Sequence, residues 1–220
     1  MSDLTIIMLT PNKVPESWAK FHKKMLLEAA GDSQIITISA EPLDWGINLI
    51  QTEYGLTNVY KQMLRGAKLA TTPYIAIADD DTLYSSEHFQ YRPPMDKFAY
   101  NFSRWHLFTW GDPFYFYKPR PGNGLLVASR ELVINALESR FQPDKPMSIA
   151  YMNELGSRKN IIEYDKAGYV AFYTYDPVVS FYHEFSVDPL CKQHRKKAWP
   201  VRAFDIPKWG KAKELRKHFI

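Results

Sequence analysis

The sequence predicts an α/β fold in which a mostly parallel central sheet is flanked by helices. Short apolar runs alternate with segments of helical periodicity through residues 4–78, an order that places helices between parallel strands. Three consecutive carboxylates, Asp79, Asp80 and Asp81, follow the apolar run at residues 74–78. Ligands of open α/β sheets gather at the carboxyl ends of strands, so these acids lie where a ligand is expected.

The first elements follow from periodicity and from helix boundary residues. Residues 4–9 are almost continuously apolar and predict a strand buried on both faces. Pro15 opens a helix that Gly31 closes, and residues 34–39 predict a second buried strand. Residues 41–56 are expected to form a loop with a short helical turn.

A second helix leads into the strand that carries the acids. Thr57 is its predicted N-cap, and its apolar positions are spaced for inward packing as far as about residue 70. The order strand, helix, strand, loop, helix, strand favours crossover connections and a parallel sheet.

The second half of the chain is rich in aromatic residues. Residues 98–110 and 114–117 predict strands or strand-like loops, and residues 125–128 predict a buried strand before a helix at 129–138. A helix is expected at 147–156. Late strands are predicted at 169–173 and 178–182. We expect one domain: a first half to about residue 82, a second half over about 83–190, and a basic tail, residues 191–220.

Composition is that of a globular protein. Of the 220 residues, 45% are hydrophobic and 24% are charged. Cys191 is the only cysteine, which excludes an internal disulfide and suits a reducing compartment. The first residues lack the pattern of a signal peptide, and no apolar run has the length needed to cross a bilayer. We therefore expect a cytoplasmic location.

The positive charge is concentrated in the basic tail. Residues 191–220 contain ten Lys or Arg and two acids, a net charge of +8 within a chain whose formal net charge is +4. This asymmetry favours a polyanionic partner, which could be nucleic acid, an anionic membrane surface or a nucleoside diphosphate. A solvated tail that aids solubility is the alternative.

The order of these motifs resembles the GT-A glycosyltransferases, which have the nucleotide-diphospho-sugar transferase fold. The resemblance covers about residues 4–185. It implies a nucleotide-sugar-binding half to about residue 82 and an acceptor and catalytic half over about 83–190, with a small aromatic-rich acceptor subdomain. It rests on the opening strand, on the segment 55–58 that leads into a helix, on the D-x-D-type tip of the strand at 74–78, and on the segment 122–130, where a glycine-containing strand turns into a helix.

This resemblance implies a nucleotide-sugar donor such as a UDP-sugar, and a bound Mn²⁺ or Mg²⁺. A metal held by carboxylates offsets the charge that develops on a departing diphosphate. Asp81 is the expected metal ligand and so counts among the catalytic residues. Asp79 is expected to belong to the metal site as well, where it touches the donor's ribose or a metal-bound water. Asp80, which also belongs to the donor site, is expected to point into the fold. His183 is the expected further ligand, with His194 as the alternative.

Other residues are placed in the donor site by their position. Thr10, Pro11 and Asn12 end the first strand and Glu41 follows the second, where the family binds the nucleobase. Lys61 and Arg65 lie four residues apart on the helix before the acids and could reach the diphosphate. A solvated helix face is the alternative for both.

An inverting transfer needs a carboxylate that takes the proton of the acceptor hydroxyl. The resemblance places this base on a helix after the glycine strand, and Glu154 is the candidate there. Asn153 and Glu154 stand where the family has a Glu-Asp pair. Inversion is therefore favoured, and a retaining mechanism is the alternative.

Aromatic and basic side chains are the candidates for acceptor binding: Trp105, Trp110, Tyr117, Arg195, Lys196 and Lys197. Aromatic rings can stack on sugars or on extruded bases, and interleaved cations hold nucleic acid. A hydroxymethylated base in DNA, as modified by some phage enzymes, is one possible acceptor. A lipid-linked or cell-envelope saccharide is the other, with the basic tail in peripheral contact with a membrane.

Three other classes compete with a glycosyltransferase. A metal-dependent nuclease or phosphohydrolase would use the acids on a phosphate ester, but the sequence offers no second acidic cluster that clearly completes a two-metal site. A nucleotidyltransferase would need a glycine-rich phosphate loop after the first strand, and residues 10–13 are not one. A non-catalytic nucleic-acid-binding module would leave the acids after a buried strand unexplained.

Overall fold

Strands and helices alternate up to the acidic triplet. The computed structural model describes residues 2–53, 55, 57–141, 153–157, 167–186 and 197–220. The first elements are β1 (Leu4–Thr10), α1 (Glu16–Ala30), β2 (Gln34–Ser39), β3 (Ile47–Ile50), α2 (Asn58–Leu69) and β4 (Tyr74–Asp79). Strand β3 corrects the prediction of a loop with a helical turn. It pairs in parallel with β2, and this pairing stabilises an edge strand too short to show a clear period.

The remaining elements build the second half. They are β5 (Thr82–Leu83), α3 (Ser86–Gln90), β6 (Phe98–Asn101), β7 (Arg104–Phe108), β8 (Tyr115–Tyr117), η1 (Asn123–Leu125), β9 (Leu126–Ser129), α4 (Arg130–Arg140), β10 (Tyr169–Phe172), β11 (Val178–Tyr182), η4 (Glu184–Ser186), β12 (Arg202–Ala203), β13 (Asp205–Ile206), β14 (Gly210–Lys211) and α5 (Ala212–Arg216). The helix expected at 147–156 lies partly outside the described residues. Its described part, 153–156, is a turn and not a helix.

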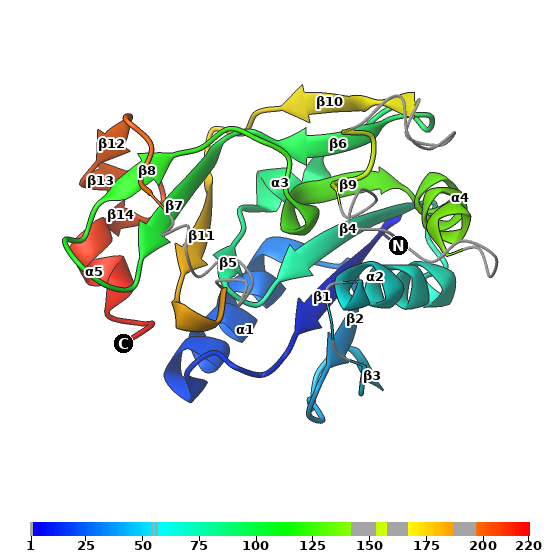
Figure 1. Cartoon of the computed structure of the whole chain (residues 1–220), viewed down its shortest axis with the longest axis horizontal. Helices are drawn as coiled ribbons and strands as arrows, with labels where there is room; N and C mark the ends of the chain where they lie inside the picture. The colour runs from blue at the N-terminus through cyan, green and yellow to red at the C-terminus, as the bar shows by residue number, and fades with distance from the viewer. Residues whose placement is uncertain (1, 54, 56, 142–152, 158–166, 187–196) are drawn as a thin grey trace.

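The central sheet has seven strands in the order β10-β6-β9-β4-β1-β2-β3 (Figure 1). Strand β9 runs antiparallel to both of its neighbours, β4 and β6. The other pairs are parallel. The predicted mostly parallel sheet with flanking helices is therefore confirmed. The carboxyl ends of β1, β2 and β4 meet at one edge, directly before the acids.

Helices α1 and α2 cover opposite faces of this sheet. Successive strand residues point to opposite sides, and α2 packs on the side of Ile7. A Cβ built on Gly66 of α2 would lie 2.5 Å from the Ile7 side chain, so this close approach requires glycine. Helix α1 packs on the other side, where His22 and Met8 border a common cavity.

A second sheet begins immediately after the acids. Its strand order is β12-β8-β7-β11-β5, and β5 pairs with β11 through Thr82 and Ser180. The first part of the aromatic stretch predicted at residues 98–110 forms β6 of the central sheet, whereas its later part and the stretch at 114–117 form β7 and β8 of the second sheet. Their alternation gives one face that packs on α1 and the C-terminal elements, and another that carries Phe108, Phe116 and Tyr182.

The C-terminal part of the basic tail belongs to the folded core. Residues 197–220 contain β12 to α5, and the buried side chains of Trp209, Leu215 and Phe219 join Trp18 in one apolar cluster. The charged residues of this segment therefore belong to a packed structure. None of the helices in the described ranges is both long enough and apolar enough to span a membrane.

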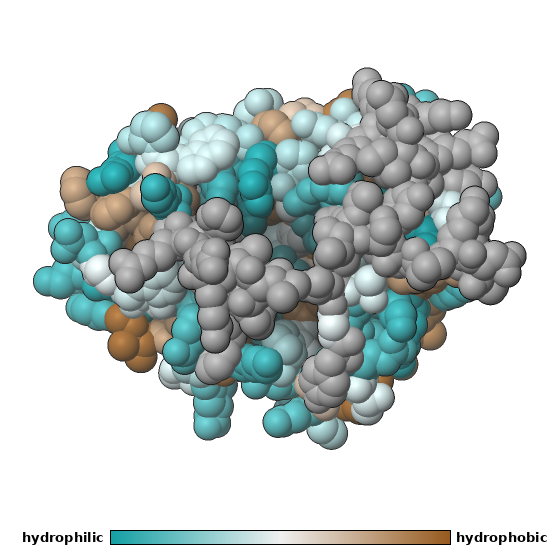
Figure 2. Space-filling model, viewed as in Figure 1, coloured by the Kyte–Doolittle hydropathy of each residue, from teal (hydrophilic) through white to brown (hydrophobic). Residues whose placement is uncertain are grey.

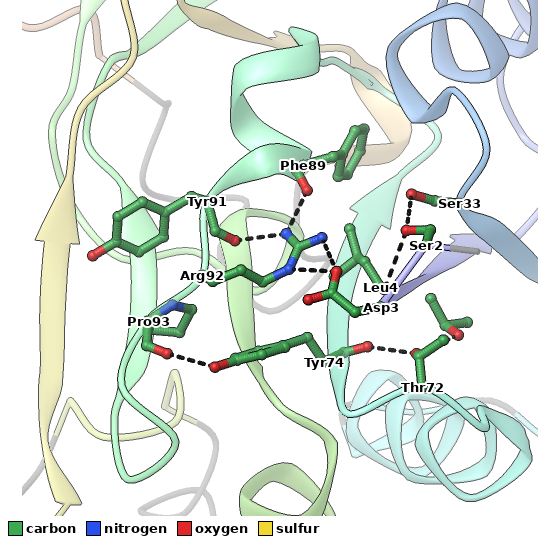
Figure 3. A network of polar contacts seen from close by, with 11 residues as sticks. Ser2, Asp3, Leu4, Ser33, Thr72, Tyr74, Phe89, Tyr91, Arg92 and Pro93 are labelled. Atoms are coloured by element: carbon green, nitrogen blue, oxygen red, sulfur yellow. Dashed lines mark hydrogen bonds and ion pairs between the residues drawn. The ribbon is translucent and has the colours of Figure 1, made fainter.

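The amino edge of the central sheet is held by a network around Arg92 (Figure 3). Its guanidinium donates to the Asp3 carboxylate at 2.6 Å and to the carbonyls of Phe89 and Tyr91 at 2.6 and 2.9 Å. The Tyr74 hydroxyl donates to the Pro93 carbonyl at 3.1 Å. These bonds tie the segment after α3 to the beginnings of β1 and β4.

Candidate active site

A cavity of about 320 Å³ lies at the carboxyl edge of the central sheet. It is lined by residues from the ends of β1, β2 and β4, from the start of α2 and from the segment after β11. All three acids of the triplet and His183 lie on its wall. The topology thus brings side chains that are about a hundred residues apart in the chain to one concave site.

Asp79 ends β4 and lies against a glycine turn. Its backbone N–H donates to the Tyr84 hydroxyl, which donates in turn to the Gly124 carbonyl, both at 2.8 Å. A Cβ on Gly124 would come within 2.1 Å of Asp79 Oδ2, so glycine leaves room for the carboxylate. Burial and the nearby Asp81 charge raise the pKa of Asp79 to about 7, against the opposing charge of Arg104.

Asp80 is held by groups from the first strand and the first helix. Its carboxylate accepts a hydrogen bond from the Thr10 hydroxyl, and its carbonyl accepts one from the Trp18 indole at 2.7 Å. Burial, followed by the charge of Asp81, raises the pKa of Asp80 to about 8. Asp80 also borders a second cavity of about 220 Å³ that lies against α1.

Asp81 and His183 form the pair best suited to a metal. His183 Nε2 lies 3.5 Å from Asp81 Oδ2, and the two side chains are 9% and 20% exposed. The Phe181 N–H donates to the Asp81 carbonyl at 2.8 Å, which fixes the end of β11 beside the triplet. A carboxylate and an imidazole suit Mn²⁺, and Mg²⁺ takes few protein ligands and completes its shell with water and phosphate.

No group of three or more His, Cys, Asp or Glu side chains within the described ranges is arranged to hold a metal. A divalent ion here would need ligands from a substrate in addition to Asp81 and His183. Phosphate oxygens of a nucleoside diphosphate are ligands of this kind. The residues present therefore fit an ion that binds together with the donor. The alternative ligand, His194, lies outside the described residues.

The predicted nucleobase contacts fall on two cavities. Thr10 lines both, Pro11 lines the larger one, and Asn12 and Glu41 line the smaller one. The Asn12 side chain accepts hydrogen bonds from the backbone N–H groups of Ala40 and Glu41 at 2.9 and 3.0 Å. Asn12 thus ties the end of β1 to the end of β2 and shapes this edge of the sheet.

The two cations predicted on α2 are engaged next to the cavity and not on its wall. Lys61 pairs with Glu53, and Arg65 donates to the Gln62 side chain at 2.7 Å. Asn58 and Gln62 point into the cavity from the same helix face and are joined to each other at 2.7 Å. Arg65 therefore orients Gln62, a cavity residue that the sequence reasoning missed.

Glu154 lies in the turn at residues 153–157, where its carbonyl accepts the Ser157 N–H at 3.1 Å. Its charge contributes to the raised pKa of Tyr60, whose main cause is burial. Tyr60 is on α2 and packs against Arg140 of α4. Glu154 is thus close to the helix that borders the cavity, but it is not among the residues on the cavity wall. Its role as the base stays a prediction.

The predicted acceptor residues are distributed over the second sheet. The rings of Trp105 and Tyr117 are 5.4 Å apart on β7 and β8. Trp110 is 46% exposed and packs against Phe108. Lys197 is exposed, while Arg195 and Lys196 lie outside the described residues.

Arg104 is the most important residue that the sequence reasoning missed. It is the first residue of β7, and its charge acts on both Asp79 and Asp81. Its Nε donates to the Ser180 hydroxyl at 3.3 Å. A charged residue at the start of an aromatic strand was the available signal. Only strand pairing shows that a single strand, β11, separates β7 from β5, the strand that follows the triplet.

Comparisons with known proteins identify the fold. No protein-family model and no curated protein matches the sequence. The chain is similar to the inositol-1-phosphate CTP transferase from T. maritima, with a TM-score of 0.50 and 10% identity over 87% of this chain and 95% of that one. It is also similar to S. aureus TarS in complex with UDP-GlcNAc, with a TM-score of 0.50 and 10% identity over 82% and 59% of the two chains.

The chain has the nucleotide-diphospho-sugar transferase fold. It spans 49% of the length of the bifunctional IspDF from Campylobacter jejuni, matched at a TM-score of 0.42 and 9% identity over 79% of this chain. Ligands of open α/β sheets bind at the edge of the sheet where the cavity lies. Because one fold supports several chemistries, the residues of that cavity determine the chemistry.

Proposed function

We propose that the protein is a metal-dependent glycosyltransferase that moves a sugar from a nucleoside-diphosphate sugar to an acceptor hydroxyl. The observation that carries this proposal is the cavity at the carboxyl edge of the sheet, with Asp81 and His183 on one wall. A site that combines a carboxylate with an imidazole suits a divalent cation together with phosphates. One solved structure with this fold, S. aureus TarS, is named as a complex with UDP-GlcNAc, which supports UDP-sugars as the donors to try first.

The donor would be held by groups from several elements. Thr10 and Pro11 would contact the base, and Asn58 and Gln62 of α2 would offer amide groups to the ribose or the diphosphate. Asp81 and His183 would hold Mn²⁺ or Mg²⁺. When bound, this ion would supply Lewis-acid stabilisation of the charge on the departing diphosphate. Asp79 and Asp80, whose pKa values are raised, would supply hydrogen bonds in the same wall.

The acceptor would approach from the side of the second sheet. Glu154 is our candidate for the residue that takes the proton of the acceptor hydroxyl. If the acceptor oxygen attacks the sugar carbon directly while the bond to the diphosphate breaks, the configuration of that carbon is inverted. A hexose is the sugar that we expect to be transferred. A cytoplasmic location remains a prediction.

The acceptor class favoured by the site is hydrophilic. Outside the grey residues, the face shown in Figure 2 is mainly hydrophilic, with apolar residues scattered over it. The basic tail has two tryptophans. Trp199 is 39% exposed, whereas Trp209 is buried and so is not available to stack on bases, which weakens the argument for DNA as the acceptor. A saccharide acceptor is therefore preferred to a DNA base.

The test is donor turnover with and without a divalent cation. Purified protein is incubated with UDP-glucose, UDP-galactose or UDP-GlcNAc in Mn²⁺ or in EDTA, and release of UDP is measured. The proposal expects release that requires the cation. Release of pyrophosphate from CTP or UTP and a sugar phosphate would instead identify a nucleotidyltransferase, and cleavage of DNA without any donor would identify a nuclease.

A further inference from the structure

Three cationic side chains converge beside the acidic triplet, on the second sheet. They are Arg104 on β7, and Lys118 and Arg120 in the segment after β8. Lys118 Nζ donates to the Tyr182 hydroxyl at 3.0 Å. The charges of Arg104 and Arg120 both act on Tyr182, and they act on each other. Tyr182 is thus the common neighbour of the three cations.

The guanidinium of Arg104 fits into space left by a glycine. A Cβ built on Gly122 would come within 2.5 Å of Arg104 Nη1, so any other residue there would push the guanidinium away. None of the ion pairs in the described ranges includes Arg104 or Arg120. The charges of Asp79 and Asp81 act on Arg104 without forming an ion pair with it, so the partly buried guanidinium keeps N–H donors, apart from its bond to Ser180, that an anion can use.

This cluster lies across the triplet from the proposed donor cavity. The cavity is bordered by β1, β2 and α2, whereas Arg104 belongs to β7 and packs against the turn at residues 122–124. Asp79 lies between the two regions, because it lines the cavity while its Oδ2 faces Gly124. Burial and the Asp81 charge raise the pKa of Asp79, and the charge of Arg104 opposes this rise, so the cationic cluster acts on the wall of the cavity from the side of the second sheet.

We infer that Arg104, Lys118 and Arg120 form a subsite for a phosphate group on the acceptor. This inference rests on the proposed function, which places the donor in the cavity on the other side of Asp79. Several converging cations bind a phosphate dianion better than they bind a single carboxylate. The planar guanidinium of an arginine can also donate two parallel hydrogen bonds to the phosphate. The preferred acceptor is then a phosphorylated sugar or polyol whose accepting hydroxyl is near the phosphate.

The ring pair of Trp105 and Tyr117 belongs to the same two strands as this subsite. Alternation along β7 places Trp105 on the opposite face from Arg104, so the rings do not line the phosphate subsite itself. Specificity for the phosphate would therefore depend on the cations, and the aromatic pair supports the sheet that carries them.

The test is calorimetric binding of glycerol 1-phosphate to the full chain, with Mg²⁺ and saturating UDP present so that the donor cavity is filled. The wild-type protein is expected to bind the probe. Arg104→Gln and Arg120→Gln are each expected to raise the Kd of the probe about tenfold. Lys211→Gln, at an exposed lysine on β14, is the matched control and should bind as the wild type does.

Two results would overturn the inference. Equal affinity of the wild type, Arg104→Gln and Arg120→Gln would show that the cluster does not bind the probe. Binding of the probe to protein without UDP, together with no binding once UDP is saturating, would assign the cations to the donor diphosphate instead. Arg120 is exposed, so its variant keeps the test valid even if Arg104→Gln is destabilised.

The same measurements separate this inference from the proposed function. If wild-type protein hydrolyses a UDP-sugar but does not bind glycerol 1-phosphate, the transferase proposal survives and the phosphate subsite is wrong. If the probe binds through Arg104 and Arg120 while no nucleotide sugar is turned over, the subsite survives and the transferase proposal is wrong.

Discussion

The two ends of strands β1 and β4 carry aspartates in opposite electrostatic settings. At the amino edge, Asp3 lies 2.6 Å from Arg92, and this hydrogen-bonded partner lowers the pKa of Asp3. At the carboxyl edge, burial and mutual repulsion raise the pKa values of Asp79 and Asp80 to about 7 and about 8. At the amino edge of the sheet an aspartate is thus paired with a cation, whereas at the carboxyl edge the aspartates lie close to one another.

The difference indicates which edge stabilises the fold and which edge binds a ligand. Arg92 also satisfies two backbone carbonyls (Figure 3), as expected of a contact that serves stability. The triplet holds three carboxylates together at a cost in stability, and such arrangements are typical of functional sites. Each prediction below changes one edge and leaves the other intact.

The largest effect is expected from Asp81→Asn. Removal of the charge that faces His183 should lower cation-dependent UDP release by roughly 10³-fold, while circular dichroism and the thermal midpoint stay close to the wild type. Asp3→Asn is the matched control at the other edge and should keep turnover within about twofold, because surface pairs contribute little. Equal losses in both variants would remove the distinction between the edges.

The second-largest effect is expected from Gly124→Ala. The added Cβ would lie 2.1 Å from Asp79 Oδ2, so the carboxylate or the turn must move, and we expect a loss of about 1–3 kcal/mol in unfolding free energy together with a large fall in turnover. The double variant Asp79→Ala with Gly124→Ala removes the clash. Its stability, measured by urea unfolding, should return to that of Asp79→Ala. A double variant that is as unstable as the two single losses combined would contradict the contact.

The pH dependence of stability should distinguish the edges in EDTA. Folded Asp79 and Asp80 keep protons that the unfolded chain loses near pH 4, so their stabilisation is complete below that pH and is lost as pH rises through 7 and 8. The free energy of unfolding should fall by about 1.4 kcal/mol per pH unit for each proton. Asp80→Asn should make this dependence on pH weaker. Asp3 works in the opposite sense, since its contribution is present above its unfolded pKa and is lost as pH falls.

A wild-type protein whose stability in EDTA does not change between pH 5 and 8 would contradict the raised pKa values of the carboxyl edge. Addition of Mn²⁺ should reverse the trend, because the cation favours the ionised carboxylates. Thermal midpoints measured at each pH, with and without the cation, provide the comparison.

The smallest effect is expected from Arg92→Ala. This change removes an exposed ion pair and two hydrogen bonds to carbonyls, so the free energy of unfolding should fall by about 1–2 kcal/mol. UDP release at a temperature well below the midpoint should stay at the wild-type rate. A loss of turnover without a loss of stability would mean that the amino edge also serves the site.

The sequence was sufficient for the elements whose signals are local. The runs at residues 4–9 and 74–78 are apolar and bounded by turn residues, and Gly31 ends α1 with a φ of 54°, which glycine adopts without strain. Strand β3 escaped detection because it depends on pairing with β2. The core role of Trp209 and Phe219 escaped it because the cations around them indicated a solvated segment.

The site was predictable in part, for the same reason. The acids were found because they follow a buried strand directly, and His183 because it follows another. Arg104 and Gln62 were missed, since their relation to the triplet depends on pairing of β7 with β11 and on which face of α2 meets the cavity. The contact of Gly124 with Asp79 likewise joins segments that lie 45 residues apart.

Cation-dependent binding of UDP tests the central claim most directly. Calorimetry with UDP is run on the wild type, Asp81→Asn and Asp3→Asn, each with Mn²⁺ and with EDTA. The account predicts that the wild type and Asp3→Asn bind UDP only with Mn²⁺, and that Asp81→Asn loses this binding. UDP binding by Asp81→Asn at wild-type affinity, or wild-type binding that EDTA leaves unchanged, would contradict it.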